Sequence, residues 1–304
     1  MHFIIGSMTK QLNAQFSIPD HVQFSDGENG FPKVTLTNSH GTVEVYLHGA
    51  HVTAFRLNTH PDPIIWISRE AVFADGKAIR GGVPICWPWF GPHPTDDTKP
   101  SHGFARNRPW SVSKTNAEND QVDIVFVLSS DDSTLKLWPH EFELRLTVCL
   151  TDQLALHLEF ANQSDQPATV GGALHSYFNV SKIEKTTVEF EEATEYIDKL
   201  DNLARESQTE PIVFDQEVDR VYFPSADETK ICDTGFERTI VVTSEGSRSV
   251  VIWNPWIEKS QRLGDFPDDG YQTMVCVETA NAADDVRIVQ PNETHLLAQT
   301  ISLR

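Results

Sequence analysis

Two neighbouring segments in the middle of the chain alternate between large apolar residues and other residues. They cover residues 142–150 and 154–160, and their apolar positions are Phe142, Leu144, Leu146, Val148, Leu150, Leu154, Leu156, Leu158 and Phe160. A period of two places every apolar side chain on one face of a β-strand. Because only Thr151, Asp152 and Gln153 separate the segments, the pattern predicts an antiparallel hairpin with one buried face.

Further strand-like segments recur along the chain, and those at residues 42–47 and 122–128 show the same alternation. The further segments cover residues 34–36, 42–47, 51–57, 64–67, 122–128, 187–190, 239–243, 250–253, 271–277 and 295–302. Only residues 69–74 and 200–205 suggest helices, each about two turns at most. Many short strands with turn signals between them predict an all-β fold, a large antiparallel β-sandwich with a few short helices.

The 304 residues are enough for one large all-β domain or two smaller ones. No low-complexity tract and no repeat of fixed period interrupts the chain. The polar stretch at residues 198–219 is too short to link two independent domains. We therefore expect a single domain over residues 1–304, with residues 1–25 as a peripheral segment.

The formal net charge of −20 argues against nucleic acid and anionic membranes as partners, because the field of the protein repels phosphate at long range. A small anion can still bind where arginines gather. No segment approaches the ~18 uninterrupted apolar residues of a membrane span, and the first residues lack the apolar core of a signal peptide.

Four cysteines, at positions 86, 149, 232 and 276, are widely spaced and form no CxxC pair. Neither a disulfide framework nor a structural zinc site is indicated. A reducing compartment fits this usage best, so a cytoplasmic location is expected.

Residues 79–106 combine glycines, prolines and tryptophans with two arginines, which no ordinary strand or helix accepts. Arg80 precedes Gly81 and Gly82, which allow a positive φ or a close approach to a ligand. Arg106 ends the related run SHGFAR. Each arginine alone is read most simply as a surface residue. Two of them in one shaped loop of an acidic chain favour an anion-binding site.

His175 lies between small and aromatic residues in GGALHSYF, and Glu278 follows the apolar run at residues 274–277. A lone histidine on a strand is usually structural and becomes a catalytic candidate only with a partner. Glu278 is that candidate partner. Its carboxylate lies either at the exposed end of a strand or in a buried position, where a raised pKa would make it a usable base.

Trp253 and Trp256 form a second aromatic concentration, in WNPWIEKS. They either close the core or offer flat faces on which sugars stack. The chain contains no G-x-S-x-G, GxGxxG, Walker or HExxH motif, which removes the commonest nucleophilic, dinucleotide, nucleotide and zinc-protease chemistries. Acid/base chemistry without a cofactor is the economical hypothesis.

Six motifs together resemble the glucose-6-phosphate 1-epimerases, the hexose-6-phosphate mutarotases of the aldose 1-epimerase superfamily. They are IRGGVPICWPWFG, SHGFAR, ALHSYFNV, EVDRVY, WNPWIEKS and MVCVET, and they follow the family's order from about residue 49 to residue 278. Any one of them would be a weak signal, but six in order cover most of the chain.

The resemblance implies a β-sandwich of the galactose-mutarotase type that requires no metal and no dissociable cofactor. By motif position, His175 resembles the family's general acid and Glu278 its general base. The family's substrate-binding positions fall on Arg80, Arg106, Asp219, His102 and Ser101. Some relatives carry glutamine where this chain has Ser101, a departure that leaves the preferred sugar open.

The residue types suit this chemistry independently of the resemblance. Interconverting α and β anomers requires removal of the proton from the C1 hydroxyl and protonation of the ring oxygen, followed by rotation about C1–C2 and reclosure. One carboxylate and one imidazole suffice. The expected partner is a phosphosugar bound by a monomeric chain.

Two rival interpretations remain at this stage. A free-aldose 1-epimerase would need no phosphate site, and a non-catalytic sugar-binding or regulatory protein would keep only the sandwich. The arginine pair argues against the first rival, and the presence of both His175 and Glu278 argues against the second.

Overall fold

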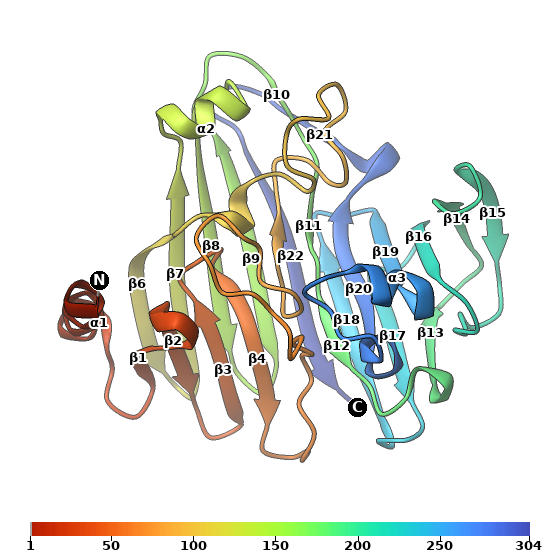
Figure 1. Cartoon of the computed structure of the whole chain (residues 1–304), viewed down its shortest axis with the longest axis horizontal. Coiled ribbons are helices and arrows are strands. Elements are labelled where there is room, and N and C mark those ends of the chain that lie inside the picture. Colours follow the sequence, from red (N-terminus) through yellow and green to blue (C-terminus); the bar gives the residue numbers. More distant parts are fainter. Residues whose placement is uncertain (1) are drawn as a thin grey trace.

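The computed structural model describes residues 2–304, and strands dominate it (Figure 1). Two eight-stranded antiparallel sheets make up most of the structure. The first, here called the site sheet, contains β15 (Ala204–Gln208), β14 (Thr194–Asp198), β16 (Val218–Phe223), β19 (Ser249–Asn254), β20 (Met274–Asn281), β11 (Gly172–Leu174) and β5 (Ile85–Cys86), with β12 (Tyr177–Asn179) also paired to β20.

The second eight-stranded sheet, here called the opposite sheet, contains β13 (Thr186–Phe190), β17 (Glu228–Asp233), β18 (Arg238–Glu245), β22 (Thr294–Leu303), β9 (Leu154–Asn162), β8 (Phe142–Leu150), β7 (Gln121–Ser129) and β6 (Ser111–Glu118). A four-stranded sheet contains β1 (Val22–Asp26), β2 (Pro32–Thr37), β3 (Gly41–Tyr46) and β4 (His51–Leu57). A two-stranded sheet pairs β10 (Ala168–Val170) with β21 (Arg287–Val289). The all-β class predicted from the alternation is confirmed, and β8 and β9 form the predicted hairpin.

Both predicted helices are wrong, for the same physical reason. Residues 69–74 and 200–203 form turns and irregular backbone, and β15 begins at residue 204. The Ser68 hydroxyl accepts a hydrogen bond from the Glu70 amide, and the Asp198 carboxylate accepts one from the Leu200 amide. Such local side-chain bonds offer the backbone a turn in place of a helix.

Three α-helices form where none was predicted: α1 (His2–Phe16), α2 (Asp132–Leu137) and α3 (Trp256–Arg262). Figure 1 shows α1 at one end of the molecule. Asn13 on α1 binds the backbone of Phe24 on β1 in both directions, through its amide nitrogen and its amide oxygen. Short 3₁₀ turns complete the elements: η1 (Glu28–Gly30), η2 (Ala105–Asn107), η3 (Ile183–Lys185), η4 (Gly270–Thr273) and η5 (Ala283–Asp285).

The main core lies between the two large sheets. Apolar side chains of the opposite sheet meet one set of alternate residues from the site sheet. On β20, Val275 and Val277 belong to this core, whereas Met274 and Cys276 belong to a separate cluster. Because neighbouring residues of a strand point to opposite faces, Glu278 shares the face of Cys276, away from the main core.

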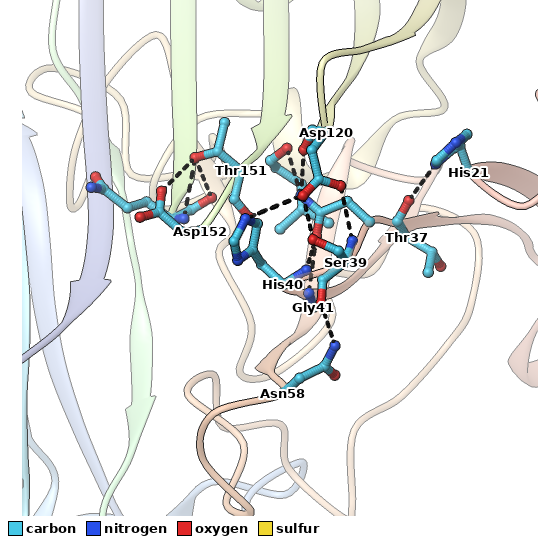
Figure 2. A network of polar contacts seen from close by, with 12 residues as sticks. His21, Thr37, Ser39, His40, Gly41, Asn58, Asp120, Thr151 and Asp152 are labelled. Atoms are coloured by element: carbon cyan, nitrogen blue, oxygen red, sulfur yellow. Dashed lines mark hydrogen bonds and ion pairs between the residues drawn. The ribbon is translucent and has the colours of Figure 1, made fainter.

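A network of polar contacts joins the four-stranded sheet to the opposite sheet (Figure 2). Asn38 donates hydrogen bonds to the carbonyls of Asp120 and Thr151. The carboxylate of Asp120 accepts hydrogen bonds from the Ser39 amide and hydroxyl and lies 3.2 Å from His40 Nε2. The network therefore fixes the turn after β2 against the turns that follow β6 and β8.

None of the helices in residues 2–304 has the length and apolar character of a membrane span. All four cysteines carry free thiols, with Cys86 and Cys276 fully buried.

Candidate active site

The strand register of the site sheet brings residues from distant parts of the chain into one row. Asp219 on β16 is paired with Trp253 on β19, Trp253 with Cys276 on β20, and Cys276 with Tyr177 on β12. Paired residues of neighbouring strands point to the same face. This row, together with Glu278 two residues beyond Cys276, forms the floor of the candidate site.

His175 and Glu278 meet on this floor. His175 follows β11, where its backbone amide donates to the carbonyl of Pro84, and its Nε2 lies 3.3 Å from Glu278 Oε1. Both residues are buried, with 8% and 1% of their surface exposed. Of the two sequence-based alternatives for Glu278, the structure selects the buried one.

Burial acts on the two groups in opposite directions. It raises the pKa of Glu278 well above its ordinary value, with Lys199 opposing the change and Asp219 adding to it. It lowers the pKa of His175 well below its ordinary value, and His102, Arg106 and Arg80 lower it further. Both shifts disfavour the charged form of the group concerned.

One atom of each group has no hydrogen-bond partner in the described part of the chain. They are His175 Nδ1 and Glu278 Oε2, both buried. A buried polar atom without a partner costs about 1–3 kcal/mol, and such atoms in native structures call for a functional explanation. The two unpartnered atoms therefore mark the pair as a candidate for binding or catalysis.

Aromatic rings surround the imidazole of His175. Tyr177 stacks on it with 5.0 Å between ring centroids and an interplanar angle of 8°, and Trp253 meets it edge-on at 6.2 Å. Trp256 lies elsewhere, against Tyr271. The two tryptophans of WNPW therefore differ: Trp253 lines the site, and Trp256 packs at the edge of the core.

The loop at residues 79–106 contributes both to the site and to the core. Gly82 has a φ of 67°, and a Cβ there would lie 2.3 Å from the carbonyl oxygen of Val52, so only glycine fits. Trp87 packs into the core against Phe104 and Phe142. The core therefore holds the loop while its arginines face the site.

Arg80 is firmly held. Its Nε donates to the carboxylate of Asp265 at 3.1 Å, and its Nη1 donates to the hydroxyl of Tyr177 at 3.2 Å. Arg106 is held less completely, because its Nη2 donates to the carbonyl of Ser101 at 2.9 Å while its buried Nε has no partner among the described residues. Ser101 itself is exposed, and this contact uses its backbone.

His102 has a defined tautomer. The backbone amide of Gly91 donates to its Nδ1 at 3.2 Å, which leaves the ring proton on Nε2. Burial, together with the smaller effect of the positive charges of Arg106, Lys199 and Arg80, lowers the pKa of His102 to about 3. The ring lies 5.8 Å from that of His175, so a neutral N–H donor stands beside the catalytic candidates.

Asp219 is held by two lysines that the sequence did not single out. Lys199 Nζ lies 2.7 Å from one carboxylate oxygen of Asp219, and Lys259 Nζ lies 3.8 Å from the other. Lys259 also binds Glu217 at 2.6 Å. Lys259 belongs to the motif WNPWIEKS, where only the tryptophans drew notice, whereas Lys199 belongs to no motif and is identified by the three-dimensional arrangement alone.

The structure thus brings most of the predicted site residues together. His175, Glu278, His102, Arg80, Arg106 and Asp219 gather around one face of the site sheet. Lys199 and Tyr177 join them as unpredicted members. Ser101 stands apart, since its only contact with this group is through its carbonyl.

Comparisons with known proteins identify the family of the chain. Residues 32–302 match the family model "Aldose 1-epimerase", and the chain therefore belongs to the aldose 1-epimerase family. An *Escherichia coli* K12 protein named "Putative glucose-6-phosphate 1-epimerase" is 38% identical over 260 residues, which cover 84% of each chain.

Solved structures show the same likeness. One is described as a "putative mutarotase" from *Salmonella typhimurium*; it superposes with a TM-score of 0.88 and 32% identity, covering 97% of this chain and 99% of the other. A galactose mutarotase related enzyme from *Lactobacillus acidophilus* superposes with a TM-score of 0.71 at 16% identity, covering 90% and 97%. The fold is thus of the galactose-mutarotase type, as the motifs implied.

Proposed function

We propose that this mutarotase-family protein interconverts the α and β anomers of a hexose 6-phosphate, with glucose 6-phosphate as the first candidate. One observation carries the proposal: three cationic side chains surround the buried His102, beside the His175–Glu278 pair. The positive charges of Arg80, Arg106 and Lys199 all lower the pKa of this histidine. Three cations around one small site stand out in a chain of net charge −20. They suit a substrate that carries its own anion.

The acid/base roles follow from the geometry of the pair. Before reaction, the proton of the Glu278 carboxylic acid moves across the 3.3 Å contact to His175, which gives a carboxylate and an imidazolium. Glu278 then takes the proton of the C1 hydroxyl while His175 protonates the ring oxygen, and the C1–O5 bond breaks. Rotation about C1–C2 and the reverse transfers give the other anomer and restore both groups.

The cations differ in how free they are to meet a phosphate. Arg80 already binds Asp265 and Tyr177, and Lys199 already binds Asp219. The Arg106 guanidinium has only the Ser101 carbonyl as a described hydrogen-bond partner. Arg106 is therefore the first candidate for a direct phosphate contact, and Arg80 and Lys199 add positive charge around it.

The same ion pairs favour the rival function, a free-aldose 1-epimerase. If Asp265 and Asp219 cancel the charges of Arg80 and Lys199, the site has less excess charge for a phosphate. In that case Asp219 and His102 would orient a neutral sugar through its hydroxyls. A non-catalytic sugar-binding protein would bind sugar without changing the rate of anomer exchange.

Exchange NMR of anomer equilibration with glucose 6-phosphate and with glucose separates these functions. A charge-assisted hydrogen bond contributes about 1.5–3 kcal/mol, so Arg106→Ala should lower kcat/KM for the phosphosugar by roughly one to two decades. Its effect on glucose should be small. Arg106→Lys should restore little activity if the contact is bidentate, because an ammonium cannot present a planar fork.

Arg80→Ala and Lys199→Ala complete the cycle, and Arg145→Ala is the control because Arg145 pairs with Glu143 on the opposite sheet. Equal losses on both sugars would favour the free-aldose function. A folded wild type that accelerates neither exchange would favour the binding protein. The expectations of no required metal or cofactor, a cytoplasmic location and a monomeric chain remain predictions.

A further inference from the structure

The catalytic pair has a third neighbour that the proposed reaction does not use, the thiol of Cys276. Cys276 lies on β20 two residues before Glu278, so both side chains share one face of the strand. One ligand atom from each of His175, Cys276 and Glu278 lies within 4.8 Å of the others. All three residues are buried.

The cluster offers one nitrogen, one sulfur and one oxygen donor in a buried position, the mixture that suits a thiophilic divalent cation. A thiol and a carboxyl group that lose their protons become a thiolate and a carboxylate. Together with a neutral imidazole they are the three donor types found in zinc sites. In these sites the metal–ligand distances are about 2.0–2.3 Å, so tetrahedral angles place donors about 3.3–3.6 Å apart.

We propose that His175, Cys276 and Glu278 form an inhibitory site for a thiophilic divalent cation, with Zn²⁺ as the representative ion. The His175 Nε2 to Glu278 Oε1 distance of 3.3 Å already meets the tetrahedral requirement. The three donor atoms lie within 4.8 Å of one another, so to reach tetrahedral separations they need to move closer by about 1 Å at most. The fourth position is left for water, as in zinc sites with three protein ligands.

Binding and catalysis exclude each other at this site. A bound cation takes a thiolate, a carboxylate and a neutral imidazole as ligands, so the thiol proton and the proton of the His175–Glu278 pair pass to solvent. Neither His175 nor Glu278 then remains to exchange protons with a sugar. Thiolate and imidazole prefer Zn²⁺ and Cd²⁺ to Mg²⁺ and Ca²⁺, so the hard cations should have no effect.

The binding test uses the purified full chain and the metal salts alone. Calorimetry with Zn²⁺ should show one site per chain that Cys276→Ser weakens by at least about tenfold. Cys86→Ser is the matched control, because Cys86 is also fully buried on the site sheet but lies outside the three-donor cluster. Cd²⁺ should produce a thiolate charge-transfer absorption in the wild type and in Cys86→Ser, and none in Cys276→Ser.

The inhibition test rests on the proposed function, whereas the binding test does not. Zn²⁺ should inhibit anomer exchange in competition with glucose 6-phosphate, and a chelator should restore the full rate. Equal zinc affinity in Cys276→Ser and Cys86→Ser would overturn the proposal, as would wild-type inhibition without the Cd²⁺–thiolate absorption. If Cys276→Ser does not fold, the wild type alone tests the metal site. Its Cd²⁺–thiolate absorption should disappear when saturating phosphosugar is added, and an absorption that persists would overturn the proposal. An inactive wild type that still binds one Zn²⁺ through Cys276 would refute the mutarotase function and leave the metal site standing.

Discussion

The molecule contains two histidine–carboxylate pairs of nearly equal separation in very different surroundings. His40 and Asp120 lie 3.2 Å apart in the surface network of Figure 2, with 47% and 41% of their side chains exposed. His175 and Glu278 lie 3.3 Å apart on the site sheet, with 10% and 1% exposed. Distance alone therefore does not distinguish a structural pair from a catalytic candidate.

The carboxylates of the two pairs respond in opposite ways. The hydroxyl and amide of Ser39 lower the pKa of Asp120, because they donate hydrogen bonds to its charged form. Burial raises the pKa of Glu278, whose Oε2 has no hydrogen-bond partner within residues 2–304. The two carboxyl groups therefore differ because of solvent exclusion and not because of the neighbouring histidine. Exclusion of water raises the pKa of a carboxyl group and makes it a candidate acid or base.

The largest effect is expected from removing the proton chemistry of the buried pair. His175→Asn and Glu278→Gln should each slow anomer exchange by roughly 10²- to 10⁴-fold, the usual contribution of a positioned acid or base. His40→Asn and Asp120→Asn should leave the rate unchanged, since the network lies outside the site. Exchange NMR on all four variants makes the comparison.

The double variant of His175 and Glu278 should be about as slow as the slower single variant, because the two groups act as one unit. Near-normal rates in both single variants would show that the buried pair is structural after all. If His40→Asn and Asp120→Asn slowed anomer exchange as much, burial would not be what distinguishes the catalytic pair from the surface pair.

The next effect concerns the charges that face Glu278. Lys199 lowers its pKa and Asp219 raises it, against the larger effect of burial. Lys199→Met should therefore move the pH limb of kcat/KM that reports ionisation of Glu278 to higher pH, and Asp219→Asn should move it to lower pH. A pH–rate profile measures the position of the limb separately from the height of the rate. Movement in the same direction would show that the limb belongs to another group.

A smaller effect is expected on stability, and it depends on pH. The folded-state pKa of Glu278 is raised, so its contribution is present below the unfolded value of about 4.3 and is lost as pH rises through the folded value. Glutamine does not ionise, so Glu278→Gln should not lose this part of the free energy of unfolding as pH rises. Its free energy of unfolding should exceed that of the wild type by on the order of 1–2 kcal/mol at neutral pH, and by less near pH 5. Urea denaturation across this pH range tests the sign.

The smallest effect belongs to the surface pair and has the opposite sign. The pKa of Asp120 is lowered, so its stabilising contribution is present above about pH 3.9 and is lost as pH falls through the folded value. Asp120→Asn should slightly destabilise the protein at neutral pH, and the difference from the wild type should disappear in acid. Denaturation that showed Asp120→Asn to be the more stable protein at neutral pH would contradict this account of the network.

Strand periodicity made the sandwich predictable, since β7, β8 and β9 bury their side chains at alternate positions. The helices were predicted wrongly, because both predicted helices are absent from their positions and three others form elsewhere in residues 2–304. The α2 helix has a capping box between Asp131 and Thr134 that a search for N-terminal caps would have found. The two false helices failed because single Ser and Asp side chains, at positions 68 and 198, form local turns that periodicity does not register.

The catalytic candidates were visible as residue types in motifs, and Gly82 was visible as one of two glycines that allow a positive φ, which the structure confirms at this position. Cys276 stood inside the motif MVCVET, but nothing in the linear order showed that its thiol faces His175. Lys199 belonged to no motif and joins the site only because β14 ends next to Asp219 on β16.

The amino-acid order thus determined the strand pattern, the shaped loop and the acid and base that the chain has to offer. Tertiary structure alone decided that Glu278 is buried, that it meets His175 at 3.3 Å and that its pKa is raised. The physical reason is that a pKa depends on how completely water is excluded and on which charges remain nearby. At this site both are set by side chains from β12, β16, β19 and the loop at residues 79–106, and by Lys199 after β14, which the sheet register brings together.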